Sequence, residues 1–206
     1  MGLDQDWLSE VSYSALADGP TTEATYTLAR SVVEQGIPGD LVECGVYAGA
    51  QCAMMARALM DLGVKNRRVH LFDSFEGIPI AGEQDEELKG KPAGISACSI
   101  EDVMANMRVW KIDEGLLEYH KGLFADTVPQ SVYRFSGQPS PSIDRIAFLR
   151  LDGDLYRSTK VCMEHLYPKL SRGGWMCVDD YNLGGARQAV HETLYPAPIY
   201  WRVPTK

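Results

Sequence analysis

Two pairs of carboxylates follow apolar runs in the second half of the chain. Asp152 and Asp154 end the first run, and Asp179 and Asp180 end the second. A segment with amphipathic spacing separates the two runs, which is the pattern of two parallel strands joined by a crossover helix. Because strand carboxyl ends line one edge of such a sheet, the four acids should converge. Like charges at close range need protons or a cation to neutralise them, so a bound divalent metal is the first hypothesis.

A glycine loop follows an apolar strand near the start of the chain. Residues 40–49 are interpreted as a short buried strand that runs into a loop with Gly45 and Gly49, and an Ala/Met/Leu-rich helix is expected over 50–62. The glycines allow a ligand to approach the backbone closely, but their spacing is not the Gly-x-Gly-x-x-Gly of dinucleotide binders. A tight strand-to-helix turn without a ligand is the alternative interpretation.

The next predicted strand, 68–73, ends in Asp73. An acid at this strand tip lies near the position where such folds bind the two ribose hydroxyls of a nucleoside. Phe75 is close enough in sequence to pack on a purine ring, and burial in the core is the alternative for this side chain.

The elements that must position these residues alternate between strand and helix along the chain. This pattern predicts an α/β fold with a doubly wound, mostly parallel sheet and helices on both faces. We expect one domain over 1–206, with a lid-like segment at 1–19. Residues 76–98 contain glycine and proline breakers without periodicity, which predicts a long loop over the site.

Composition limits the classes of partner. The chain has 206 residues, a formal net charge of −8 and no Lys/Arg cluster, which argues against nucleic acid or an anionic membrane as partner. It has no apolar run of about 18 residues, and its first residues are acidic, so we expect a cytoplasmic protein. Five cysteines without metal-type spacing are interpreted as reduced thiols.

Five motifs, taken together, resemble the macrocin O-methyltransferase (TylF-like) family. They have the same order and matching intervals, and they lie at residues 42–49, 73–79, 122–129, 149–159 and 173–181. The resemblance implies a class I, Rossmann-like methyltransferase that uses S-adenosylmethionine (SAM) and Mg²⁺. It also implies methylation of a hydroxyl on a small acceptor, with a sugar as the expected substrate.

The resemblance also implies roles for individual residues. The cofactor would be bound by the glycine loop and the second strand tip, through Glu43, Gly45, Tyr47, Gly49, Asp73, Ser74 and Phe75. The metal would be bound by Asp152, Asp179 and Asp180, since hard oxygen ligands without Cys or His suit Mg²⁺. Asp152 would also be the catalytic group that takes the proton from the acceptor hydroxyl. Asp154 could support this site or cap the next helix.

The C-terminal segment and the function both leave alternatives open. The sequence after the last helix has room for about one strand, so a shortened C-terminal strand pair is expected, and a homo-oligomer could complete the open pocket. Asp152-Gly-Asp154 after an apolar strand would also suit a metal-dependent nucleotide-sugar glycosyltransferase. A third possibility is a protein that binds the cofactor without turnover.

Overall fold

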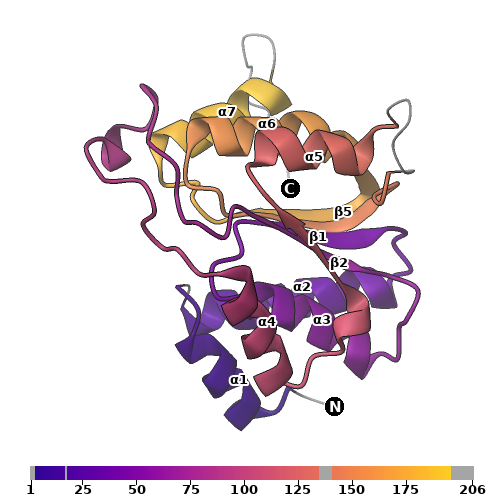
Figure 1. Cartoon of the computed structure of the whole chain (residues 1–206). Coiled ribbons are helices and arrows are strands. Elements are labelled where there is room, and N and C mark those ends of the chain that lie inside the picture. Colours follow the sequence, from indigo (N-terminus) through magenta and orange to yellow (C-terminus); the bar gives the residue numbers. More distant parts are fainter. Residues whose placement is uncertain (1–2, 17, 135–140, 196–206) are drawn as a thin grey trace, which may run out of the picture.

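The computed structural model describes residues 3–16, 18–134 and 141–195, and these form a three-layer α/β fold (Figure 1). The sheet has the strand order β3-β2-β1-β4-β5, and every pair of neighbouring strands is parallel. The strands are β1 (Asp40–Cys44), β2 (Val69–Asp73), β3 (Leu117–Lys121), β4 (Ile146–Leu151) and β5 (Leu170–Val178). The predicted doubly wound, parallel α/β fold is therefore confirmed for the described residues.

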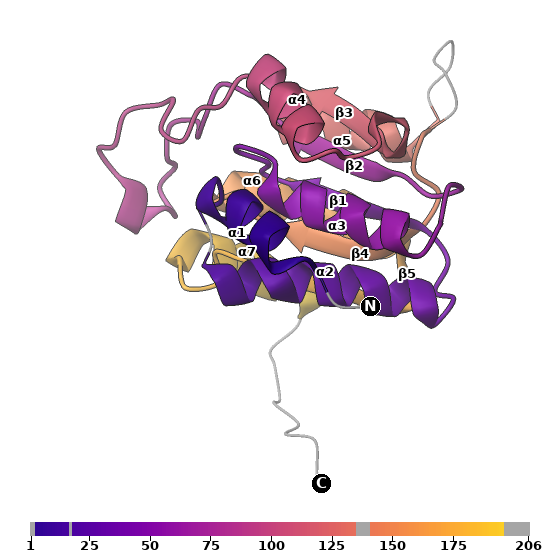
Figure 2. The ribbon, with the colours of Figure 1, turned by 90° about the horizontal axis from the view of Figure 1, so that it is seen from below.

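Helices cover both faces of the sheet, as Figures 1 and 2 show. One face carries α1 (Gln5–Tyr13), α2 (Gly19–Glu34), α3 (Ala50–Asp61) and α4 (Ile100–Val109). The other face carries α5 (Phe124–Val132), α6 (Tyr156–His165) and α7 (Gly184–Leu194), and three short 3₁₀ helices are η1 (Glu86–Leu88), η2 (Glu114–Leu116) and η3 (Tyr167–Lys169). Within the described residues, no helix has the length and apolar character needed to span a bilayer. The strand expected near 199–203 lies outside the described residues.

The central strands are buried on both faces, which explains their continuous apolar runs. Every residue of β4 is buried, and the two apolar cores lie on opposite faces of the sheet. The side chain of Arg150 lies inside this otherwise apolar strand and is only 1% exposed. A buried guanidinium needs anionic partners, which the site supplies.

The N-terminal helix α1 is attached to α4. Trp7 Nε1 donates a hydrogen bond of 2.9 Å to the carbonyl oxygen of Trp110, and Val11 is fully buried. The residues after α1, from Ser14 to Leu16, line the cavity described below. This position is compatible with the lid-like role expected of residues 1–19, which stays a prediction.

The long loop predicted at 76–98 contains η1 and runs beside α6 and α7 (Figure 1). Asp85, only 3% exposed, accepts hydrogen bonds from the backbone N–H groups of Gly82 (2.8 Å) and Tyr156 (2.7 Å). Glu87 accepts a hydrogen bond of 3.0 Å from the N–H of Gly184. The middle of the loop therefore caps the first residues of α6 and α7, where helix N–H groups lack intrahelical partners.

Gly45 provides a test of how tightly β1 and β4 meet. Its φ is 92°, and a Cβ atom there would lie 1.6 Å from the carbonyl oxygen of Asp152. Gly36 has a similar φ of 66° with no heavy atom near its Cβ position. Gly45→Ala should therefore lower the free energy of unfolding by at least about 3 kcal/mol, and Gly36→Ala by about 1 kcal/mol. Urea unfolding measures both, and equal losses would contradict the close approach.

Candidate active site

A cavity of about 260 Å³ opens at the carboxyl edge of the sheet. Its walls come from the loops after β1, β2, β3, β4 and β5. Eight of the residues assigned to the site from the sequence line it, namely Glu43, Gly45, Tyr47, Asp73, Ser74, Asp152, Asp179 and Asp180. The structure thus brings the predicted cofactor and metal residues to one cavity, while Gly49 and Phe75 are not among its lining residues.

The loop after β1 has three residues in the left-handed region of backbone space, Gly45 (φ 92°), Tyr47 (φ 47°) and Gly49 (φ 92°). Gly49 makes room for α4, because a Cβ atom there would lie 2.6 Å from Cε of Met107. Tyr47 has a side chain and adopts this conformation at a cost in strain. Phe75 and Asp154, at the ends of β2 and β4, also have positive φ values. Strained backbone therefore surrounds the cavity at three strand ends.

Asp73 links the loops after β1 and β2. Its Oδ2 accepts hydrogen bonds from the N–H groups of Val46 (2.6 Å) and Tyr47 (3.3 Å), and its Oδ1 accepts one from Phe75 (2.8 Å). A carboxylate has about four acceptor positions, so capacity for a ligand hydroxyl remains. Asp73 fixes the shape of the glycine loop in addition to facing the cavity.

Phe75 and Ser74, both expected to lie beside the adenosine, differ in the structure: Ser74 lines the cavity and Phe75 does not. Phe75 is 5% exposed and belongs to the apolar core, which is the alternative considered above, and its ring does not line the cavity. Ser74 lines the cavity, but its hydroxyl donates to the carbonyl oxygen of Gly77 at 3.0 Å. The burial of Phe75 in the core accompanies a positive φ of 56°.

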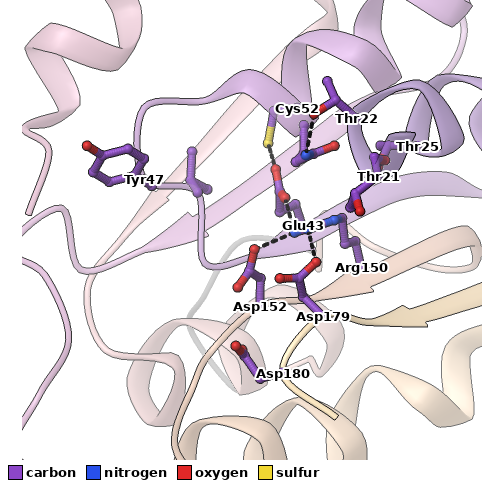
Figure 3. A network of polar contacts seen from close by, with 12 residues as sticks. Thr21, Thr22, Thr25, Glu43, Tyr47, Cys52, Arg150, Asp152, Asp179 and Asp180 are labelled. Carbon is purple, nitrogen blue, oxygen red and sulfur yellow. Dashed lines mark hydrogen bonds and ion pairs between the residues drawn. The ribbon is translucent and has the colours of Figure 1, made fainter. Parts of the chain in front are cut away.

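Arg150 is the centre of the charged cluster below the cavity (Figure 3). Its Nη1 donates to Glu43 Oε1 at 3.0 Å and to Asp152 Oδ2 at 2.5 Å, and its Nη2 donates to Asp179 Oδ1 at 2.5 Å. Glu43 also accepts a hydrogen bond from Cys52 Sγ. The guanidinium of Arg150 therefore neutralises part of the charge of the converging acids. Its contacts also connect the ends of three strands, β1, β4 and β5.

The sequence analysis missed Arg150, although a signal was present. A single basic residue lay in the apolar run of β4, two positions before Asp152. Residues two apart in a strand face the same side of the sheet. The strand register also places Arg150 opposite Glu43 and Cys177, so these side chains share one row.

Negative charge still exceeds positive charge around Arg150. Burial raises the pKa of Glu43 to about 7, although Arg150 opposes this shift. Partial burial, together with Asp152 and Asp154, raises the pKa of Asp180 to about 7. Burial and the charges of Asp152 and Asp179 raise the pKa of Asp154 to about 6. Such shifts mean that this cluster favours an added proton or cation.

Of the three acids expected to bind the metal, Asp180 is the one that Arg150 does not contact. Figure 3 shows it apart from the guanidinium, and its Oδ2 accepts a hydrogen bond of 2.8 Å from the N–H of Asp154. Asp152, Asp179 and Asp180 each offer a carboxylate oxygen, and these oxygens lie within 4.8 Å of one another. Arg150 uses one oxygen each of Asp152 and Asp179, which leaves the second oxygen of each for another partner.

The beginning of α3 forms the opposite wall of the cavity. Its N-cap, Gly49, makes no side-chain capping hydrogen bond, and Ala50 and Gln51 line the cavity. Gln51 is 6% exposed, and its Oε1 is a buried acceptor without a hydrogen-bond partner. Uncapped N–H groups favour an anionic ligand group, and the amide oxygen favours a donor. The sequence analysis did not identify Gln51, because a polar residue in the first turn of a helix is common.

Comparisons with known proteins identify relatives of the chain. A 4′-O-methyltransferase from Streptomyces olivaceus, named for 8-demethyl-8-(2,3-dimethoxy-alpha-L-rhamnosyl)-tetracenomycin-C, is 36% identical over 92% of this chain and 70% of its own length. Demethyldecarbamoylnovobiocin O-methyltransferase from Streptomyces niveus is 39% identical over 74% of this chain and 56% of its own length. The chain thus spans between 56% and 70% of these two relatives.

The fold of the chain is also similar to that of a solved O-methyltransferase structure. The solved structure of the O-methyltransferase NovP superposes with a TM-score of 0.77 and 34% identity, covering 87% of this chain and 72% of that one. The family model described as Macrocin-O-methyltransferase (TylF) matches residues 6–195. The chain therefore belongs to the macrocin-O-methyltransferase family of O-methyltransferases.

Proposed function

We propose that the protein transfers a methyl group from SAM to a hydroxyl of a sugar-bearing small molecule, with the help of Mg²⁺. One observation carries this proposal. A single cavity has donors and an unpaired acceptor at the start of α3, and a cluster of partly free carboxylates at the ends of β4 and β5. The two ends of the cavity therefore suit two different ligands, a methyl donor at α3 and an acceptor at the carboxylates, which would react within the same cavity. The names of the relatives, which refer to rhamnosyl and novobiocin compounds, suggest a sugar hydroxyl as acceptor.

The residues present fit SAM. Its amino acid part carries a carboxylate and an ammonium group, which match the uncapped N–H groups of α3 and the free Oε1 of Gln51. Asp73 retains acceptor capacity for a ribose hydroxyl. These matches support the assignment of Asp73 to the cofactor side of the cavity and add Gln51 to it.

The residues present also fit Mg²⁺. Asp152, Asp179 and Asp180 are hard oxygen donors that converge within 4.8 Å, and Arg150 alone does not balance their charge. When bound there, the ion would lower the pKa of a coordinated hydroxyl and fix its position. Asp152 would accept the hydroxyl proton, since Arg150 holds one of its oxygens and thereby orients the other. Burial raises the pKa of Asp152, which suits a proton acceptor.

The family relationship argues against the glycosyltransferase alternative, and turnover separates an enzyme from a cofactor-binding protein. With SAM and Mg²⁺, the protein should methylate rhamnosylated aromatic aglycones but not the same aglycones without the sugar. Mass spectrometry of the products measures the transfer. Methylation of both compounds would contradict a sugar hydroxyl as acceptor, and SAM binding without any product would favour a protein without turnover.

Gln51→Leu should weaken SAM binding by about 10- to 100-fold, because it removes an acceptor for the ammonium group. Without ligand the variant should have about the stability of the wild type, because it loses both a buried acceptor without a partner and the 3.3 Å hydrogen bond that Gln51 Nε2 donates to Thr22 Oγ1. Calorimetry and thermal melts measure the two effects. Gln188→Leu on the exposed side of α7 is the matched control. Equal SAM affinity in both variants would reject the contact.

Asp180→Asn should change how stability depends on pH. The pKa of Asp180 is about 7 in the folded protein, against about 3.9 for an unfolded Asp, so between these values only the folded state binds the proton. Stability of the metal-free wild type should therefore fall as pH rises from about 4 to about 7. The variant lacks this component, so it should melt higher than the wild type at pH 8, and the two should converge at about pH 4.

Mg²⁺ provides the second half of this test. At pH 8 the ion should raise the melting temperature of the wild type and raise that of Asp180→Asn much less, since binding to the folded state alone stabilises it. Asp126→Asn is a control, because Asp126 lies in the first turn of α5 outside the cluster. A wild type that gains nothing from Mg²⁺ would contradict a metal site at these acids.

A further inference from the structure

A second polar cluster lies on β2 and β3, separate from the cavity. His70, Glu118 and His120 each offer a ligand atom, and these atoms lie within 4.8 Å of one another. In the strand register His70 lies opposite Val42 and Glu118, and Val42 belongs to the core on the α5 side of the sheet. His70 precedes Asp73 by three residues, or about 10 Å along the strand. The cluster is thus distinct from the acids around Arg150, which lie on the other row of side chains.

The outer nitrogens of both imidazole rings have acceptors. Nε2 of His70 lies 3.4 Å from Oδ2 of Asp40, and a carboxylate can only accept. Nδ1 of His120 lies 3.2 Å from Oγ of Ser131, whose own hydroxyl donates to the carbonyl oxygen of Thr127 at 3.0 Å. When the Ser131 hydroxyl donates to Thr127 in this way, both outer nitrogens carry the proton.

The inner nitrogens are then both lone-pair acceptors. Nδ1 of His70 and Nε2 of His120 lie 3.0 Å apart, and Glu118 places Oε2 at 3.8 Å from the first and Oε1 at 3.7 Å from the second. In this arrangement a cation among the three acceptors would offset their repulsion, whereas a proton on one inner nitrogen would give a hydrogen bond between the two imidazoles instead. The side chain of His70 is fully buried, and that of His120 is 12% exposed.

The geometry points to a zinc site formed by His70, Glu118 and His120. Ligand atoms about 2.0–2.1 Å from a tetrahedral Zn²⁺ are about 3.3 Å from one another. The two imidazole nitrogens are 3.0 Å apart here, and each lies 3.7 or 3.8 Å from one of the two oxygens of Glu118. The two rings face each other with planes 23° apart, so they would tilt toward Glu118 on binding. Two imidazoles and one carboxylate favour Zn²⁺ over Mg²⁺.

Supporting contacts and access also match a metal site. The contacts to Asp40 and Ser131 are the carboxylate and hydroxyl partners that fix metal-binding imidazoles. Glu118 has a side chain that is 38% exposed, so an ion can enter and a water can take the fourth position. The ion would join the edge strand β3 to β2, and through Ser131 to α5. Its role is therefore structural, and it does not depend on the function proposed above.

The test uses the untagged full chain, freed of metal with a chelator and then saturated with Mg²⁺ so that the acids around Arg150 are occupied. Zinc chloride is titrated by calorimetry, and thermal melts follow. We expect one Zn²⁺ per chain and a melting temperature about 5–10 °C higher at a hundredfold excess over Kd. His120→Gln should weaken zinc binding at least about 100-fold, and Glu118→Gln about 10- to 100-fold. Glu118→Gln is a conservative change at a partly exposed position, so it keeps the test valid if His120→Gln does not fold.

Two control variants locate the ion. His165→Gln changes a half-buried histidine on α6 away from the cluster, and Asp180→Asn changes the other acid cluster, so both should keep the zinc affinity of the wild type. Cobalt(II) in place of zinc should give the visible spectrum of a tetrahedral ion, which is lost in His120→Gln. The proposal is overturned if the wild type binds zinc no more tightly than Glu118→Gln. It is equally overturned if binding survives in that variant and disappears in Asp180→Asn.

Discussion

The guanidinium of Arg150 is the interaction on which the site depends. It is buried in β4 and contacts carboxylates after or within β1, β4 and β5, so it fixes three strand ends relative to one another. Removal of such a buried cation would leave three carboxylates without compensation, which is far more costly than the net value of any one pair. The cluster therefore keeps a fixed arrangement of acids, and the remaining excess of negative charge is what a divalent ion can use.

The fold could be predicted because it depends on local patterns. Continuous apolar runs such as β4 identify buried parallel strands, and their carboxyl ends must meet at one edge. The convergence of Asp152, Asp179 and Asp180 followed from that rule alone. The argument from repulsion to a metal was incomplete, because it did not count Arg150. A charged residue within a strand has no fixed partner in the sequence, and only the register reveals that Glu43 is opposite.

Contacts between distant segments could not be predicted in this way. Asp85 lies in a stretch without periodicity, yet it caps α6, whose first residue is 71 positions away in sequence. Phe75 shows the same limit at short range. Its sequence position suits either a purine or the core. In the structure its side chain is buried, its φ is positive, and its N–H donates a hydrogen bond to Asp73. Tertiary constraints thus decide what local propensity leaves open.

Charge also relates the two ends of the cavity. SAM carries a positive sulfonium, which becomes a neutral thioether when the methyl group leaves, so a strongly negative field would favour the reactant over the transition state. Arg150 reduces this field but does not cancel it, since Asp154 and Asp180 keep raised pKa values beside it. A divalent ion at the acids would reduce the field further just where the acceptor hydroxyl loses its proton. The acids around Arg150 would then hold the ion and the acceptor together, and the ion would keep their charge from retaining the methyl group on the cofactor.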